Sequence, residues 1–320
     1  MIDEIFYSFN PIYNKDSSVL ILGSFPSVKS RDIDFYYGNP NNRFWKILEY
    51  ITDCPYSTSS QDEKIALLHK HGIALWDMVE SCQIKGSMDS DLNLLSVNNI
   101  SKVLEQASIS KIYCNGNLSD KLFQKYYSKD YASIEAKLPS SSPANARFRL
   151  KDLVKAWSLI LPYIKTELEL TTLVYIENAG RYLMLNRNKK ANDINHGKWI
   201  GLGGHIEKEE SADACIAREV YEESGLVIKE EDFKARGFIK FKAQGHKTEI
   251  MYLYSASCDS DKLIECDEGD LAWIDKDAIM ELNLWEGDKI FLDKLLKNQD
   301  YFCLSLNYDR EGHLIDSQEI

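Results

Sequence analysis

Three glutamates in the second half of the chain, Glu219, Glu222 and Glu223, are spaced so that one helix would bring them to the same face. Residues three and four positions apart are neighbours on a helix surface. Carboxylates this close repel one another unless a positive charge lies between them, and Mg²⁺ or Mn²⁺ with oxygen ligands supplies such a charge. The spacing therefore predicts a metal-binding helix that begins at residue 211 or 212 and ends at Gly225.

The residues around these glutamates match the Nudix box, G-x5-E-x7-R-E-U-x-E-E-x-G-U, without a gap. The matching residues are Gly204, Glu210, Arg218, Glu219, Val220, Glu222, Glu223, Gly225 and Leu226. Residues 168–320 thus resemble Nudix hydrolases, which implies metal-dependent hydrolysis of a nucleoside diphosphate linked to another group. The resemblance implies that the three glutamates bind the metal together with the Gly203 carbonyl. The general base would be a box glutamate or Glu249 on a later strand.

Two further stretches, GKWIGLGGHIE and ELNLWEGDKIFL, resemble the MutT-type branch that hydrolyses oxidised purine triphosphates. By this resemblance Trp285 would stack on a purine and Asp288 would form a hydrogen bond with it. Arg218 is expected to tie back to the loop before the helix and to belong to the nucleotide site. Ile200 departs from the pattern, because members of that branch often have a purine-reading Asn there, so the base preference stays open.

Three loops rich in Gly, Pro, Ser and Asn mark the first half of the chain: residues 20–30, 35–48 and 138–147. Each lies at the end of a predicted strand or the start of a predicted helix. In an open parallel sheet such loops converge at the carboxyl edge, where ligands bind. Their backbone amides and small side chains can approach phosphates closely.

Together these loops resemble the uracil-DNA glycosylase superfamily over roughly residues 15–160. GSFPS stands in the place of the first motif, NPNNRFW resembles a segment of mismatch-specific uracil glycosylases, and PSSSPANAR resembles the loop that enters the duplex. Phe25 stands where most members have a catalytic Asp or Asn, and GSFP with YYGNP is similar to the hypoxanthine-DNA glycosylase branch. The resemblance implies that catalysis passes to Asn39.

A base must leave the stack before its glycosidic bond can be attacked. Phe25 and Phe44 are expected to stack on the extruded base, beside Gly23 and Ser24. The loop residues expected to contact DNA are Ser140, Ser141, Ser142, Pro143, Ala144 and Arg147. No lysine stands at an obvious nucleophile position, so hydrolysis without a cofactor and without strand cleavage is expected. Asp77 and residues 86–92 are expected at the same rim, without an assigned role.

The charge distribution and the alternation of strands and helices divide the chain into two parts. Residues 1–165 hold 19 Lys/Arg and 18 Asp/Glu, and residues 166–320 hold 19 and 32. Short apolar strands alternate with helical patterns in the first part, which is typical of a parallel sheet covered on both faces. We therefore expect an α/β protein: a three-layer, parallel-sheet glycosylase domain over 1–165 and a Nudix α/β/α sandwich with a mixed sheet over 166–320.

The seven cysteines are scattered and include no CxxC pair, which argues against a disulfide framework and a structural zinc site. No apolar run approaches the roughly 20 residues needed to span a bilayer, so we expect a cytoplasmic protein without a membrane partner. The hypothesis is a bifunctional enzyme that excises hypoxanthine from damaged double-stranded DNA and hydrolyses oxidised purine nucleoside triphosphates. The alternatives are a first domain that binds DNA without catalysis or excises uracil, and a second domain that senses a ligand. Protein partners are not assigned.

Overall fold

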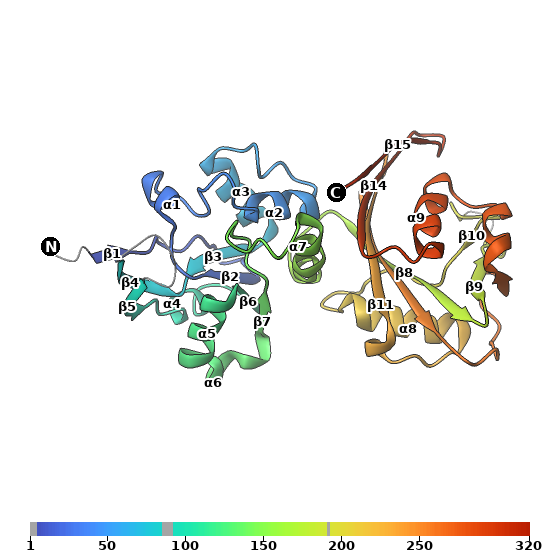
Figure 1. The fold of residues 1–320 in the computed structure, drawn as a ribbon, viewed down its shortest axis with the longest axis horizontal. Coiled ribbons are helices and arrows are strands. Elements are labelled where there is room, and N and C mark those ends of the chain that lie inside the picture. The colour runs from blue at the N-terminus through green and yellow to red at the C-terminus, as the bar shows by residue number, and fades with distance from the viewer. Residues whose placement is uncertain (1–4, 85–91, 191–192) are drawn as a thin grey trace. The chain divides into compact units, whose positions relative to one another are not determined.

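The computed structural model describes residues 5–84, 92–190 and 193–320. Its chain forms two compact units, Met1–Thr166 (unit 1) and Glu167–Ile320 (unit 2) (Figure 1). Both units combine sheets with covering helices, so the predicted α/β class is confirmed. Residues 86–91, expected at the rim of the first site, lie outside the described residues.

A four-stranded parallel sheet forms the centre of unit 1, with the order β3-β2-β6-β7. Its strands are β2 (Val19–Gly23), β3 (Ile73–Asp77), β6 (Lys111–Asn115) and β7 (Glu135–Leu138). Every residue of β2 and β3 is buried, as expected for parallel strands covered on both faces. A second, antiparallel sheet has the order β1-β4-β5, from β1 (Ile5–Tyr7), β4 (Val79–Ile84) and β5 (Leu92–Val97).

Helices cover both faces of the parallel sheet. Figure 1 shows α2 (Phe44–Thr52), α3 (Gln61–His71) and α7 (Leu150–Trp157) on one side. On the other side lie α4 (Ser101–Leu104), α5 (Asn117–Tyr126) and α6 (Ser128–Tyr131). Short elements complete the unit: α1 (Val28–Asp32), η2 (Ala132–Ile134) and η3 (Ser158–Tyr163). The chain is α-helical only to Trp157, and the following stretch, which contains Pro162, is a 3₁₀ helix.

Unit 2 is built on a mixed sheet of eight strands among its described residues, with the order β10-β9-β8-β12-β11-β14-β15 and β13 beside β9. The strands are β8 (Glu169–Asn178), β9 (Arg181–Asn186), β10 (Trp199–Ile200), β11 (Lys234–Ala243), β12 (Glu249–Ser257), β13 (Asp270–Asp275), β14 (Phe302–Tyr308) and β15 (Leu314–Glu319). β8 pairs with β12 and β11 with β14 in parallel, and the other pairs are antiparallel.

Two long helices cover the sheet of unit 2. α8 (Ala212–Ser224) has Ser211 as its N-cap and ends at Gly225, whose φ of 73° is left-handed, so the predicted helix limits are confirmed. Thr172 of β8 faces α8, where its Oγ1 lies 3.4 Å from Cys215 Sγ. The neighbouring Leu173 faces α9 (Glu286–Leu296), because strand residues alternate between faces. The short 3₁₀ helices are η4 (Glu230–Asp232) and η5 (Lys276–Glu281).

All seven cysteines lie in the described residues and are free thiols. Within the described part of the chain, no helix is long and apolar enough to cross a membrane.

Candidate functional site

Three neighbouring strands of unit 1 end in residues that meet at the carboxyl edge of the parallel sheet. Gly23 ends β2, Asp77 ends β3 and Asn115 ends β6. A Cβ on Gly23 would lie 2.2 Å from Asp77 Oδ1 and 3.3 Å from the Tyr37 hydroxyl. Glycine is therefore required at position 23, because any side chain would displace the Asp77 carboxyl group.

Asn115 connects the two loops that were predicted to bind the base and the DNA. Its Nδ2 donates to the Tyr37 hydroxyl at 3.1 Å and to Ser141 Oγ at 3.0 Å. Its Oδ1 accepts from the Ser141 N–H at 2.9 Å. Sequence reasoning missed Asn115, although a polar residue directly after the buried strand KIYC was an available signal.

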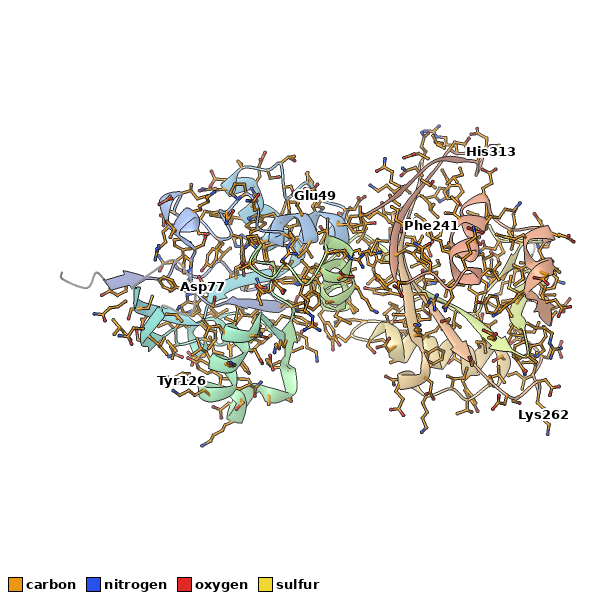
Figure 2. All side chains as sticks on the ribbon, in the orientation of Figure 1. Glu49, Asp77, Tyr126, Phe241, Lys262 and His313 are labelled. Atoms are coloured by element: carbon orange, nitrogen blue, oxygen red, sulfur yellow. The ribbon has the colours of Figure 1, made fainter. Side chains whose placement is uncertain are left out.

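Asp77 is a buried carboxyl group at this edge. Its side chain lies inside unit 1 (Figure 2), and the residue is only 4% exposed. Among the described residues, Oδ2 has no hydrogen-bond partner. Burial raises the pKa of Asp77 to about 7. Unpartnered buried polar groups and strongly shifted carboxyl groups are concentrated at functional sites, so Asp77, which had no assigned role, joins the candidate site.

The aromatic residues near this edge differ from the prediction in one respect. Phe44 is completely buried, and the Tyr37 ring is stacked on it with 3.8 Å between the ring centroids. The prediction that Phe44 stacks on a base therefore does not fit the structure, because its ring has no exposed face and instead supports Tyr37. Phe25 and Ser24 are partly exposed, with the Arg31 guanidinium 5.8 Å from the Phe25 ring centroid.

Asn39 is partly exposed in the turn that precedes α2. Its Oδ1 accepts from the Asn41 N–H at 3.0 Å, so the side chain helps to hold the turn. The next cation, Arg43, was not predicted. Its guanidinium donates to the carbonyls of Ser142, Asn145 and Phe148, which clamps the 140–148 loop to the start of α2.

The residues of the 140–147 loop that were predicted to contact DNA differ in their exposure. Pro143, Ala144 and Arg147 are exposed. Ser141 is completely buried and bonded to Asn115, so the prediction that it grips a phosphate with its side chain does not fit. Ser140 and Ser142 are partly exposed, and the Ser142 N–H donates to Ser140 Oγ at 3.2 Å.

In unit 2, the loop before α8 contacts two of the predicted metal-binding glutamates, which lie on α8. The Gly203 N–H donates to Glu223 Oε2 at 2.9 Å. A Cβ on Gly204 would lie 2.5 Å from the carboxylate of Glu219. The backbone of these two glycines thus packs directly against the carboxyl groups of Glu219 and Glu223. Glu223 is 7% exposed, and burial, followed by the nearby charges of Glu268 and Glu219, raises its pKa to about 8.

Arg218 forms the predicted tie to Glu210, with Nε 2.9 Å from Oε1 and Nη2 2.9 Å from Oε2. Its Nη1 also lies 2.7 Å from Glu219 Oε1 and 3.3 Å from Glu222 Oε2. Because every nitrogen of this guanidinium already has an acceptor, the assignment of Arg218 to nucleotide binding does not fit. Its role in the structure is to fix the loop and to neutralise carboxylates.

Glu249, the first residue of β12, is a partly buried carboxyl group beside the loop. Thr171 Oγ1 donates to its Oε1 at 2.6 Å. Burial raises the pKa of Glu249, and the charge of Glu249 contributes to the raised pKa of Asp288. Burial is the largest cause of the Asp288 shift, to about 8. The fold therefore brings Glu249 into the electrostatic neighbourhood of the predicted base-reading residue.

Trp285 and Asp288 lie together at the start of α9. Trp285 is partly buried, its Nε1 donates to Asn195 Oδ1 at 2.8 Å, and Lys198 Nζ lies 4.7 Å from the ring centroid. Ile200 is partly exposed on β10, beside this region.

Comparison with known proteins assigns each unit separately. A model described as the NUDIX domain matches residues 168–295. A hypoxanthine DNA glycosylase of Methanosarcina acetivorans is 30% identical over 153 residues, which are 48% of this chain and 95% of the relative. An oxidized purine nucleoside triphosphate hydrolase of Danio rerio is 30% identical over 135 residues, which are 42% of this chain and 83% of the relative. The chain belongs to the hypoxanthine DNA glycosylase and Nudix families, one in each unit.

A solved structure of a MutT protein from Bacillus halodurans is 22% identical, with a TM-score of 0.43, and covers 48% of this chain and 97% of that chain. The glycosylase-family unit is unit 1 and the Nudix unit is unit 2.

Membership of the Nudix family implies dependence on a divalent metal ion. The Nudix unit fits such an ion chemically, since Glu219 and Glu223 offer carboxylate oxygen atoms, and, after burial, the charges of Glu268 and Glu219 raise the pKa of Glu223. Among the described residues, no three acidic, histidine or cysteine side chains already converge as a metal cluster. Glu222, with 57% of its side chain exposed, is instead directed to Arg218.

Proposed function

We propose that the protein is bifunctional: its glycosylase-family unit excises hypoxanthine from double-stranded DNA, and its Nudix unit hydrolyses purine nucleoside triphosphates, oxidised ones among them. The two halves of this proposal rest on different observations. They are therefore tested by separate experiments on the same full-length chain.

For the glycosylase-family unit, the supporting observation is the group of Gly23, Tyr37, Asp77 and Asn115 at one sheet edge. In the proposed reaction, water attacks C1′ of deoxyinosine, the bond between C1′ and N9 breaks, and the base leaves with the electron pair. The proton that the water loses is balanced by one taken up by the departing base, so the products are free hypoxanthine and an abasic site. Asn39 holds the water by its amide oxygen. Asp77 in its neutral form donates a hydrogen bond to the extruded base, and the exposed residues Pro143 and Arg147 contact the duplex.

Substitution Asn39→Ala is expected to lower hypoxanthine excision from a deoxyinosine duplex by about 100-fold or more, because the attacking water is no longer held in the reacting position. Excision is measured as abasic-site formation, with a uracil duplex in parallel. Asn39→Asp keeps an acceptor for the Asn41 N–H and thereby separates catalysis from turn formation.

The matched control is Asn41→Ala, an exposed side chain in the same turn, which should leave excision unchanged. Excision that survives Asn39→Ala would contradict the role of Asn39. A wild-type protein that binds both duplexes without excising either base would instead favour a DNA-binding module, and a preference for the uracil duplex would favour uracil as the substrate.

For the Nudix unit, the supporting observation is the placement of Glu219 and Glu223 against the glycine backbone of the preceding loop. Bound Mg²⁺ would neutralise phosphate charge and lower the pKa of a nucleophilic water. Glu219, Glu223 and the Gly203 carbonyl would hold it, and Glu222 would join them on leaving Arg218. Glu249 accepts the proton of the attacking water, while Trp285 and neutral Asp288 contact the purine.

With Mg²⁺, the protein is expected to convert 8-oxo-dGTP to the monophosphate and diphosphate with kcat/KM at least about 10-fold above that for dGTP. Products are separated by ion-exchange chromatography, and ATP and dCTP complete the panel. Equal rates for purines and pyrimidines would contradict the purine assignment, and release of single phosphate would contradict the proposed bond cleavage.

A further inference from the structure

The sheet face that packs against α9 changes from apolar to polar toward one end. On β12 the residues on this face change from Leu253 in the core to Ser255 and Ser257. On β8 the change is from Tyr175 to Glu177. An apolar face buries against a helix, so polar residues at its end mark a region that the helix does not cover.

A cavity of about 750 Å³ lies at this polar end. Its walls include Glu177, Ser255 and Ser257 from the sheet, and Leu295 and Leu296 from the last turn of α9. The volume falls within the range of small-molecule sites, about 300–1,000 Å³. Three cations also line the cavity: Lys234, Arg236 and Lys276.

Arg236 is a buried cation for which the described part of the chain offers no acidic partner. It is 5% exposed and stands where the pairing of β11 with β12 shifts register, between Ala235 and Gly237. Its Nη atoms donate to Asn298 Oδ1 at 3.0 Å and to the Gln299 carbonyl at 2.7 Å. Within residues 5–84, 92–190 and 193–320, its Nε has no hydrogen-bond partner and no carboxylate forms an ion pair with it. Burying such a charge is costly unless an anion compensates it.

The other charges around the cavity leave this positive charge uncompensated. Lys276 Nζ lies 2.7 Å from a carboxylate oxygen of Glu177, so these two residues neutralise each other. Lys234 is exposed and Asp232 is the remaining acidic residue. Two cations against one acid leave one net positive charge, in a unit whose sequence carries 13 more acidic than basic residues. This net positive charge attracts anions to the cavity.

The cavity is separate from the carboxylate helix and its nucleotide site. Glu249 is the first residue of β12, and Ser255, six residues later, is the nearest residue of this strand that lines the cavity, so about 20 Å of strand separates Glu249 from the cavity. Asp288 lies in the first turn of α9 and Leu295 near its end, about 10 Å apart along the helix.

We propose that this cavity is a second ligand site that binds a phosphate group, carried either by inorganic phosphate or by a nucleoside monophosphate. The positive charge of Arg236 attracts the phosphate, whose oxygens accept from Lys234 at the mouth, and the hydroxyls of Ser255 and Ser257 add neutral donors. The site does not depend on either proposed activity, so it is tested by binding alone.

The test is isothermal titration calorimetry of the full chain in metal-free buffer with EDTA, using inorganic phosphate and AMP as separate probes. Removing divalent ions suppresses binding at the carboxylate helix. Saturable binding is expected, weakened at least 10-fold by Lys234→Glu. The matched control Lys262→Glu reverses an exposed charge at the outer edge of unit 2 (Figure 2) and should change affinity less than 2-fold.

Ser255→Asp is a second variant that places a negative charge inside the cavity, and it should also weaken binding at least 10-fold. Binding of both probes with equal affinity identifies inorganic phosphate as the recognised group, whereas tighter binding of AMP identifies a nucleoside monophosphate. The proposal is overturned if neither probe saturates, or if Lys234→Glu and Ser255→Asp leave binding unchanged while the variants remain folded by circular dichroism.

Discussion

Replacement of Glu219 by glutamine is expected to reduce nucleotide hydrolysis by about 100-fold or more while leaving base excision unchanged. Even outer-sphere partners of a bound metal typically contribute about 10–100-fold to affinity or activity, and a direct ligand should reach the upper end of that range. Glutamine has the shape of Glu219, so the contact with Gly204 is kept and only the charge is lost. The measurement is kcat/KM for triphosphate hydrolysis across a Mg²⁺ titration, with excision assayed on the same preparation.

The matched control is Glu281→Gln, an exposed carboxylate at the end of η5, which should leave both activities unchanged. Unaltered hydrolysis by Glu219→Gln would remove the carboxylate from the proposed metal site. Parallel loss of hydrolysis and excision would show instead that the two activities share one structural requirement.

Substitution Asp77→Asn is expected to stabilise the protein at pH 8 by about 1–3 kcal/mol. Because the asparagine amide is also a hydrogen-bond donor, the variant should keep base excision and should not lose it above pH 7. Burial raises the pKa of Asp77 to about 7, above the ordinary value of 3.8. Ionising this carboxyl group in the folded protein therefore costs about 4 kcal/mol above neutral pH. Asparagine removes that cost but leaves a buried amide that lacks partners, which reduces the net gain.

The pH dependence of this effect has a definite sign. Below about pH 4, Asp77 is protonated in both folded and unfolded chains and costs nothing. As the pH rises from about 4 to about 7, the unfolded chain releases this proton while the folded chain retains it, so stability falls. The stabilisation by Asp77→Asn should therefore be largest at pH 8 and disappear near pH 5. Wild-type excision should also fall above pH 7, because the neutral donor is lost.

Urea denaturation at pH 5 and pH 8 measures the first effect, and excision rates across the same range measure the second. The exposed Asp16→Asn is the matched control and should show neither change. If the free energy of unfolding differs between variant and wild type by the same amount at pH 5 and pH 8, Asp77 ionises freely in the folded protein. Excision by Asp77→Asn that still falls above pH 7 would show that the protonation of Asp77 does not control the reaction.

The local features were predicted from sequence because they depend on residue spacing along one element. The helix between Ser211 and Gly225 requires only a capping hydroxyl, a helical spacing of apolar residues and a terminal glycine. The hairpin after β8 is equally local, because Ala179 and Gly180 have φ values of 48° and 80°, which suit a tight turn. The Arg218 tie to Glu210 needed only the box spacing.

Tertiary structure alone decided which side chains are accessible. Phe44 is an aromatic residue that could stack on a base, but it is buried, and its ring packs against Tyr37. Ser141 has a hydroxyl group that could bind a phosphate, but it is also buried, and its hydroxyl accepts from Asn115. Asp77 and Asn115 meet only because parallel strands far apart in sequence end at one edge. Sequence spacing determined which residues share a helix or a turn; burial, and the free energy of leaving a polar group unpartnered, arise only when separate elements pack together.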